Sequence, residues 1–215
     1  MDERPRVQDL KLIFKILAYA LGIILSLWAV TVFYLSNAHP DITWDWNSIN
    51  TSDIHFPSSF AWGTATAAHQ VEGNNSNNNW YQWEKAVDEN GISRIHNNDS
   101  SAMAADHWNR YPEDILLMKD LGVSHYRFSI EWSRIEPQKG YYDLESLSHY
   151  RKMCLAMIKA GITPVVTLHH FTHPIWFEEL GAFEKETNTE HFTKFAKLVF
   201  QELMDIVPIW CTFNE

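Results

Sequence analysis

Cysteine and positive charge are both scarce in this sequence. Its two cysteines, Cys154 and Cys211, make neither a disulfide framework nor a metal-binding spacing, so we expect both to be core thiols. Lysine and arginine number 17 against 27 aspartates and glutamates, for a net charge of −10. The lack of a basic patch that neutralises phosphates argues against a nucleic-acid partner. The eleven histidines also lack metal-ligand spacing, and no cofactor is expected.

Apolar and aromatic residues, in contrast, are plentiful. Hydrophobic residues make up 46% of the chain and aromatic residues 14%, which suits a globular protein with a substantial core. Ten of the residues are tryptophan. Tryptophan planes stack well on sugar rings, but they are also ordinary core material, so the count alone favours a role in the core.

Residues 16–35 form an uncharged, apolar run of twenty residues. At about 1.5 Å per residue, a helix of this length spans about 30 Å, the thickness of the hydrocarbon core of a bilayer. Basic residues precede the run and acidic residues follow it (Arg4, Arg6, Lys11 and Lys15 before it; Asp41, Asp45 and Asp53 after it). This asymmetry predicts a single-pass membrane protein, with residues 1–15 as a cytoplasmic tail and the rest of the chain on the extracytoplasmic side.

A cleaved signal peptide is the alternative for the same run. Ser36-Asn37-Ala38 resembles a cleavage site, and cleavage there would produce a secreted protein. The run is longer than the roughly 7–15 apolar residues of a signal peptide, so a retained anchor is favoured. Residues 36–55 are polar and predict a linker. Asn50, Asn74 and Asn98 begin sequons, which matter only in a secretory pathway that glycosylates.

From residue 56 onward, strand and helix patterns alternate. Short apolar runs predict strands at residues 60–63, 123–130, 163–170 and 208–215. The first of the helices between them is predicted to begin at Pro112 and to end at Gly122. Its core face is expected to be formed by Ile115, Leu116 and Leu117.

Two further helices follow the same logic. Apolar residues from Leu144 to Ile158 recur at helical spacing, and Gly161 ends that helix. The next helix is predicted to open with a capping box formed by Thr187 and Glu190. Pro208 then introduces the final strand.

Strands that alternate with helices predict a parallel sheet. The polar residues that end the four strands would gather at one face, which is where a (β/α)8 barrel keeps its chemistry. A doubly wound sheet is the alternative, but no glycine-rich phosphate loop follows the first strand. We therefore expect an α/β protein in which residues 56–215 hold about the first four βα units of a (β/α)8 barrel, preceded by one transmembrane helix.

Four motifs in this region carry a family resemblance. Residues 56–73 (FPSSFAWGTATAAHQVEG) resemble the N-terminal signature of the family 1 glycoside hydrolases, the β-glucosidase family. Residues 126–135 (YRFSIEWSRI), 166–170 (VTLHH) and 212–215 (TFNE) resemble the motifs of that family's second, third and fourth strands. A lone Asn-Glu pair would be unspecific, whereas four motifs in the right order are highly specific.

The resemblance implies a retaining β-glycosidase that hydrolyses the O-glycosidic bonds of β-glucosides or related sugars. Glu215 would be the acid/base that protonates the leaving oxygen and then activates water. Asn214 would hydrogen-bond the sugar 2-OH, and Gln70 and His170 would hold the outer hydroxyls of the glycone, the sugar whose anomeric carbon reacts. Arg127 would lie beneath the catalytic carboxylates and orient the nucleophile.

The sequence also departs from the family pattern. Phe171 stands where tryptophan is usual, so stacking area is kept and an N–H donor is lost, and His169 stands where tyrosine is common. Retaining hydrolysis needs two carboxylates about 5–5.5 Å apart. The family's nucleophilic glutamate lies in a later Thr-Glu-Asn-Gly motif, which these 215 residues do not contain. Glu72 and Glu131 are available carboxylates, but neither occupies the nucleophile's position.

We therefore expect these 215 residues alone to be inactive and prone to aggregate, because four strands with open edges expose unpaired backbone. The full product is expected to be longer. Two other functions are weighed: a membrane-anchored transglycosylase of glycolipids, which the anchor motivates, and a binding module that lost catalysis, like the klotho proteins. Retention of Asn214 and Glu215 argues against the second.

Overall fold

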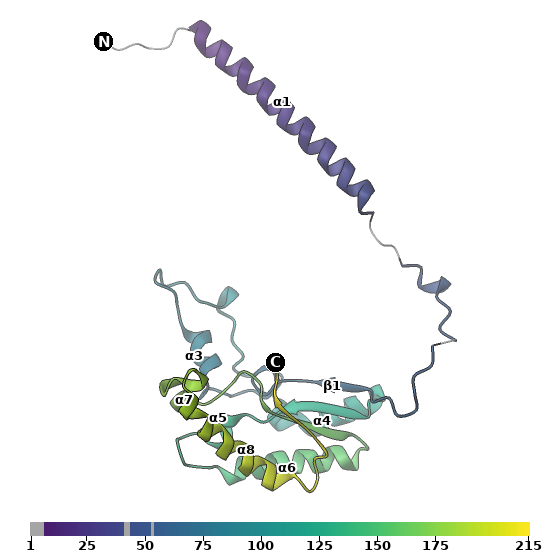
Figure 1. The fold of residues 1–215 in the computed structure, drawn as a ribbon, viewed down its shortest axis with the longest axis vertical. Coiled ribbons are helices and arrows are strands. Elements are labelled where there is room, and N and C mark those ends of the chain that lie inside the picture. Colours follow the sequence, from purple (N-terminus) through teal and green to yellow (C-terminus); the bar gives the residue numbers. More distant parts are fainter. Residues whose placement is uncertain (1–6, 41–43, 53) are drawn as a thin grey trace. The chain divides into compact units, whose positions relative to one another are not determined.

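The computed structural model describes residues 7–40, 44–52 and 54–215 (Figure 1). It divides into two compact units, Met1–Phe56 and Pro57–Glu215. The first unit contains the long helix α1 (Val7–Ala38) and a short 3-10 helix at Trp46–Ser48.

Helix α1 contains one stretch, Lys11–Ala38, that is long and apolar enough to cross a membrane. Three of its polar side chains bond to the backbone of the same helix. Ser26, Thr31 and Asn37 each donate to the carbonyl four residues earlier, at 2.8, 2.9 and 2.8 Å. Such local bonds remove the need for water, which suits an apolar surrounding.

The second unit is built on a four-stranded sheet in the order β1 (Gly63–Ala65), β2 (His125–Ser129), β3 (Thr163–His169) and β4 (Ile209–Phe213). All neighbouring strands are parallel, which confirms the predicted arrangement. The register pairs Gly63 with His125, and His125 with Thr163. The carboxyl ends of the strands therefore lie at the same edge of the sheet.

The first strand lies further along the chain than residues 60–63, so that prediction was wrong. Strand β1 begins at Gly63 because this position touches the neighbouring strand. A Cβ added there would lie 2.8 Å from the carbonyl oxygen of His125, closer than real Cβ atoms approach a backbone. The aromatic residues just before it stay largely at the surface, with Phe60 46% and Trp62 52% exposed.

Helices α4 (His107–Leu121), α6 (Leu144–Lys159) and α8 (Thr189–Leu203) lie against one face of the sheet (Figure 1). Shorter helices occupy the connections: α2 (Ala68–Val71), α3 (Asn79–Lys85), α5 (Trp132–Ile135), α7 (Ile175–Glu179), and 3-10 turns at His96–Asn98, Ala182–Glu184 and Glu186–Asn188. Gly122 and Gly161 follow α4 and α6 with φ of 80° and 84°, the left-handed conformation that ends a helix.

Helix α4 begins at His107, and Pro112 lies inside it, so the predicted start at Pro112 was wrong. A proline within a helix has no N–H for the carbonyl four residues earlier. In α4 that carbonyl belongs to Trp108, and it accepts instead from Nε2 of His149 in α6, at 2.9 Å. The carbonyl left free by the proline therefore joins two helices.

The predicted core face of α4 was also wrong in part. Ile115 is buried, but Leu116 and Leu117 are 60% and 66% exposed, and Met118 takes the next inward position. Successive residues of a helix point about 100° apart, so Ile115 and Met118, three residues apart, share a face. Leu116 and Leu117 directly follow Ile115, so they point to other sides of the helix.

The capping box predicted for α8 does not form. Thr187 lies in the 3-10 turn that precedes the helix, and the N-cap residue is Asn188, whose side chain makes no cap. Its amide instead donates to the carbonyls of Leu180 and Ala182, at 3.1 and 2.9 Å. Asn188 therefore fastens the preceding loop to the start of the helix.

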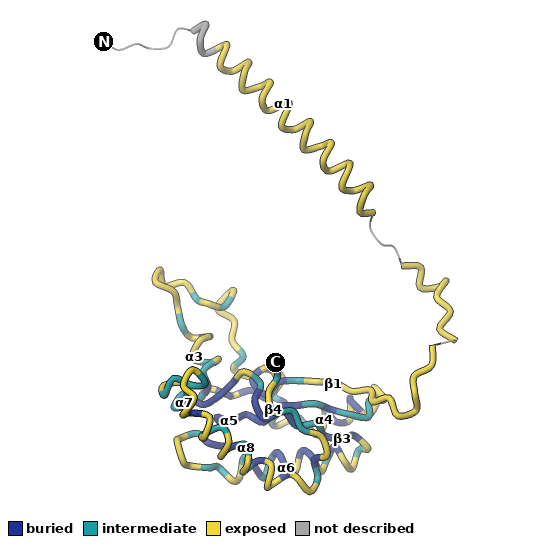
Figure 2. The backbone as a smooth tube through the Cα atoms, viewed as in Figure 1, coloured by how far each residue is buried: buried dark blue, intermediate teal, exposed yellow. Residues whose placement is uncertain are grey.

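The core lies between the sheet and these helices (Figure 2). Trp132 is fully buried at its centre, with ring centroids 4.6 Å from Phe177 and 5.0 Å from Phe195. Cys154 in α6 is also fully buried, as expected of a core thiol, while Cys211 in β4 is partly exposed.

Candidate active site

Four of the five predicted site residues follow the ends of parallel strands, and the fifth, Arg127, lies within β2. Gln70 lies in α2 after β1, Arg127 is the third residue of β2, and His170 follows β3. Asn214 and Glu215 follow β4. The parallel topology therefore brings together residues that are up to 145 positions apart in the chain, at the edge where barrel enzymes hold their active sites.

Arg127 and Asn214 are in direct contact. Nη1 of Arg127 donates to the side-chain oxygen of Asn214 at 3.1 Å. The backbone N–H of Asn214 donates to the carbonyl of His169 at 3.0 Å, which fixes its position beside β3. Arginine has no acceptor, so the amide oxygen must face it, and the amide N–H groups of Asn214 are left to donate elsewhere.

Gln70 and His170 share a pocket of about 220 Å³. Trp80 and Phe171 also line it, with ring centroids 6.5 Å apart. Phe171 is 43% exposed and has a φ of 66°, a conformation that is unusual for a residue with a side chain. The pocket therefore combines an amide and an imidazole with two aromatic rings.

Two further site residues, Arg127 and Glu215, carry charges that act on the His170 imidazole. Burial is the main effect that lowers the pKa of His170, and the positive charge of Arg127 lowers it further. The carboxylate of Glu215 acts in the opposite direction and raises it. His170 is therefore a neutral imidazole near neutral pH, able to donate one hydrogen bond and to accept another.

A second imidazole lies at the wall of the same pocket. His69 is buried, its Nε2 lies 2.8 Å from the carboxylate of Glu84, and its Nδ1 lies 3.1 Å from the amide of Asn78. The carboxylate of Glu84 also accepts from the backbone N–H of Ser101 at 3.0 Å. These bonds fix the wall of the pocket beside Gln70.

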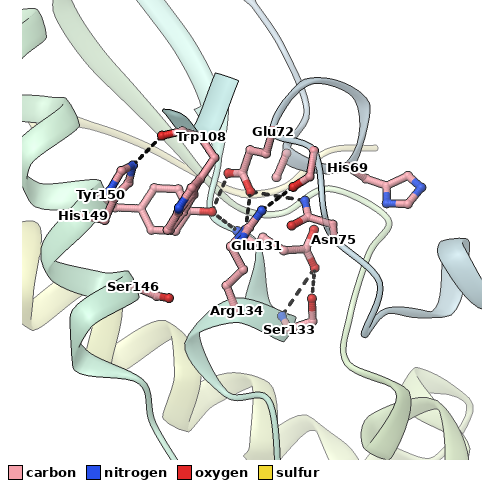
Figure 3. Close-up of polar contacts among 12 residues, drawn as sticks. His69, Glu72, Asn75, Trp108, Glu131, Ser133, Arg134, Ser146, His149 and Tyr150 are labelled. Carbon is pink, nitrogen blue, oxygen red and sulfur yellow. Dashed lines mark hydrogen bonds and ion pairs between the residues drawn. The ribbon is translucent and has the colours of Figure 1, made fainter. Parts of the chain in front are cut away.

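A cluster of polar contacts joins Glu72, Arg134 and Tyr150, with Glu131 and Ser133 beside them (Figure 3). Nε of Arg134 donates to one oxygen of Glu72 at 2.9 Å, and the hydroxyl of Tyr150 donates to the other at 2.5 Å. The guanidinium of Arg134 also lies 4.1 Å from the ring centroid of Trp108. Burial raises the pKa of Glu72, while Arg134 and the Tyr150 hydroxyl oppose that change.

Glu131 is the second buried carboxylate of the cluster and is fully enclosed. One of its oxygens accepts from the hydroxyl of Ser133 at 2.7 Å, and the other accepts from the hydroxyl of Thr172 at 2.8 Å. Its backbone N–H donates to the Tyr150 hydroxyl at 2.9 Å. The cluster thereby joins the loops that follow β1, β2 and β3.

Reasoning from the sequence did not find two residues of this cluster. Arg134 and Thr172 were not predicted as site residues, although Arg134 lies within the second motif and Thr172 lies two residues after His170. The bonds of Arg134 to Glu72 and of Thr172 to Glu131 join loops that are distant in the sequence, so they are recognisable only once the fold brings these loops together.

His169, which lies next to the site, should make the stability of the folded protein depend on pH. Burial, and then the charges of His173 and His170, lower its pKa to about 4 from 6.5. The unfolded chain takes up this proton near pH 6.5, whereas the folded protein does not until about pH 4. The resulting stability is fully present above pH 6.5 and is lost as the pH falls, by up to about 3 kcal/mol at pH 4.

The free energy of unfolding of the full-length protein, measured by urea denaturation from pH 7 to pH 4, tests this expectation. The variant His169→Tyr should lose less stability over this range than the parent protein. His96→Tyr, at an exposed position, is the control and should behave as the parent. Identical pH profiles for the parent and His169→Tyr would contradict the assignment.

Comparisons with known proteins agree with the motifs. A model of the family described as glycosyl hydrolase family 1 matches residues 52–215. Beta-glucosidase A of Acetivibrio thermocellus is 39% identical over 168 residues, which cover 76% of this chain and 37% of that protein. The human cytosolic beta-glucosidase is 35% identical over 164 residues, which cover 74% of this chain and 35% of that protein.

Solved structures show the same relationship. A beta-glucosidase from Thermotoga maritima in complex with castanospermine matches with a TM-score of 0.70 and 32% identity, over 74% of this chain and 37% of that one. The beta-glycosidase BGL167 matches with a TM-score of 0.68 and 42% identity. The chain thus spans little more than a third of the length of these relatives.

These structural relatives are (β/α)8 glycosidases, and part of their length matches this chain. The family match covers everything from just before the first strand to Glu215, including all four strands and all five predicted site residues. The parallel sheet, the motifs at the strand ends and the relatives agree, and the chain belongs to glycosyl hydrolase family 1.

Proposed function

We propose that the full-length protein is a retaining β-glycosidase that hydrolyses β-glucosides or related sugars. The observation that carries this proposal is the arrangement at the strand ends. Gln70 and His170 line one pocket, the charges of Arg127 and Glu215 both act on His170, and Arg127 holds Asn214. The names of the relatives, which are beta-glucosidases, support the same activity.

Glu215 would act as the acid/base. It protonates the leaving oxygen as the glycosidic bond breaks, and its carboxylate then removes a proton from the attacking water. A carboxyl group suits this task when its pKa is raised toward neutrality by its surroundings. The approach of a second carboxylate would supply such a rise, because two like charges at short distance cannot both ionise readily.

The other site residues would hold the glycone. The N–H groups of Asn214 that Arg127 leaves free can donate to the sugar 2-OH, a bond that strengthens in the oxocarbenium-like transition state. The Gln70 amide and the neutral His170 imidazole can each donate and accept, which matches the outer hydroxyls. Arg127 would also orient the nucleophile.

The nucleophile itself is expected in a Thr-Glu-Asn-Gly motif beyond these residues. Glu72 and Glu131 are poor candidates because they are only 3% and 0% exposed. Both oxygens of each carboxylate already accept hydrogen bonds, from Tyr150 and Arg134 in one case and from Ser133 and Thr172 in the other. A carboxylate bound in this way cannot attack an anomeric carbon.

The stereochemistry of hydrolysis tests the proposal. The full-length protein should release glucose from an aryl β-glucoside first as the β-anomer, because two displacements restore the configuration. Proton NMR of the anomeric region, recorded before mutarotation, measures this directly. Castanospermine, which binds the Thermotoga relative, should inhibit by occupying the same pocket. Release of the α-anomer first, or no hydrolysis, would contradict the proposal.

We also propose that α1 anchors the protein in a membrane, with the barrel on the extracytoplasmic side. The support is the apolar stretch Lys11–Ala38, in which Ser26, Thr31 and Asn37 bond to carbonyls of the same helix. An anchor would bring the site close to glycolipids, which keeps transglycosylation as the second candidate. Product analysis distinguishes the two activities, because the glycone is transferred to water in one and to a lipid sugar in the other.

A further inference from the structure

Two of the proposed glycone-binding residues are each followed, two positions later, by a member of the buried cluster. Gln70 is followed by Glu72, and His170 is followed by Thr172. In each pair the first residue lines the pocket and the second residue is buried, and Thr172 also forms part of the pocket wall. The same buried cluster is therefore bonded to the chain next to Gln70 and to the chain next to His170.

We propose that this cluster is a positioning device that sets the distance between Gln70 and His170 and so determines how tightly the glycone is held. The inference rests on the function proposed above, because it assumes that these two residues bind a sugar. Glu72, Tyr150, Glu131 and Thr172 are its positioning residues, since they act through Gln70 and His170.

A continuous path of hydrogen bonds joins the two walls. Tyr150 donates to Glu72 at 2.5 Å and accepts from the backbone N–H of Glu131 at 2.9 Å. The carboxylate of Glu131 then accepts from Thr172 at 2.8 Å. Every residue on this path is at most 6% exposed, so water does not compete for these bonds.

The loop between His170 and Thr172 needs such support. Phe171, the residue between them, has a φ of 66°, which residues with side chains avoid unless their surroundings hold them there. The bond from the Thr172 hydroxyl to Glu131 holds the chain on the far side of this residue. Without that bond, we expect the loop to relax and the His170 ring to move.

Binding of castanospermine to the full-length protein, measured by calorimetry, tests the proposal. Thr172→Val removes the hydroxyl at nearly constant volume and should weaken binding roughly fivefold to tenfold, because small displacements of binding groups are costly. Thr172→Ser keeps the hydroxyl and should restore the affinity. Thr167→Val is the matched control, since the hydroxyl of Thr167 is buried in β3 without a hydrogen-bond partner among the described residues.

The same substitution in a protein that lacks the His170 ring separates positioning from a general structural role. In the His170→Ala background, Thr172→Val should have no further effect on affinity, because the group that it positions is gone. Partial unfolding, in contrast, would lower the number of binding sites in both backgrounds and leave the affinity unchanged. Equal affinity losses in both backgrounds, or no loss in the parent protein, would overturn the proposal.

Hydrolysis of an aryl β-glucoside, measured on the same samples, distinguishes the two claims. A parent protein that binds castanospermine without hydrolysing the glucoside would disprove the proposed activity, and the positioning test would still stand. A parent protein that does not bind castanospermine would show that Gln70 and His170 form no glycone pocket. The positioning proposal would then be overturned as well.

Discussion

Replacement of Glu215 by glutamine should lower kcat of the full-length protein for alkyl β-glucosides by about 10³-fold. Glutamine matches the glutamate in shape but cannot donate a proton to the leaving oxygen. The loss should be much smaller for a dinitrophenyl β-glucoside, because dinitrophenolate leaves without protonation. Steady-state kinetics with both substrates measure this difference.

The dependence on the leaving group is the informative part of this experiment. Glu179→Gln, in an exposed position of α7, is the matched control and should leave both rates unchanged. A variant that loses the same factor with both substrates would have lost something other than a proton donor. Unchanged hydrolysis of alkyl glucosides by Glu215→Gln would rule out Glu215 as the acid.

Replacement of Arg134 by methionine should destabilise the full-length protein by about 3–5 kcal/mol. The side chain of Glu72 is only 4% exposed, and Arg134 is its cationic partner at 2.9 Å. Removal of the arginine leaves a buried carboxylate without a counter-ion, and it also removes the contact with Trp108. The free energy of unfolding from urea denaturation measures the effect.

Two further variants show whether the buried charge is the cause. The double variant Glu72→Gln, Arg134→Met should recover part of the loss, because no uncompensated charge remains. Arg110→Met removes an arginine from an ion pair with Glu113. The side chains of Arg110 and Glu113 are 56% and 62% exposed. That control should cost far less than Arg134→Met, because solvent screens an exposed ion pair. A similar loss for the two arginines would argue against burial as the cause.

The parallel sheet and the set of polar residues at its edge were predictable from the sequence, because both follow from local patterns. Apolar runs followed by Gln70, His170 or Glu215 mark strand ends, and alternation with helices dictates parallel pairing. The motifs then supply the order of the strands.

The details that failed depend on distant partners. The start of α4 was misjudged because Pro112 is tolerated within the helix once His149 from α6 takes up the free carbonyl of Trp108. The start of β1 depends on the carbonyl of His125 beside Gly63. The role of Thr172 depends on Glu131, 41 residues away. No local pattern contains these contacts.

The order of the sheet also bears on how the protein is made. Each strand is hydrogen-bonded to the strand that precedes it in the chain, from β1 to β4, and parallel pairing of this kind, across a helical connection, forms more slowly than contacts within one helix or hairpin. As the ribosome delivers about 5–20 residues per second, each new βα unit meets a partner strand that has already been synthesised. Assembly can therefore follow the direction of translation. At every stage the sheet has two open edges, β1 and the strand made most recently, and each new unit covers the second of them.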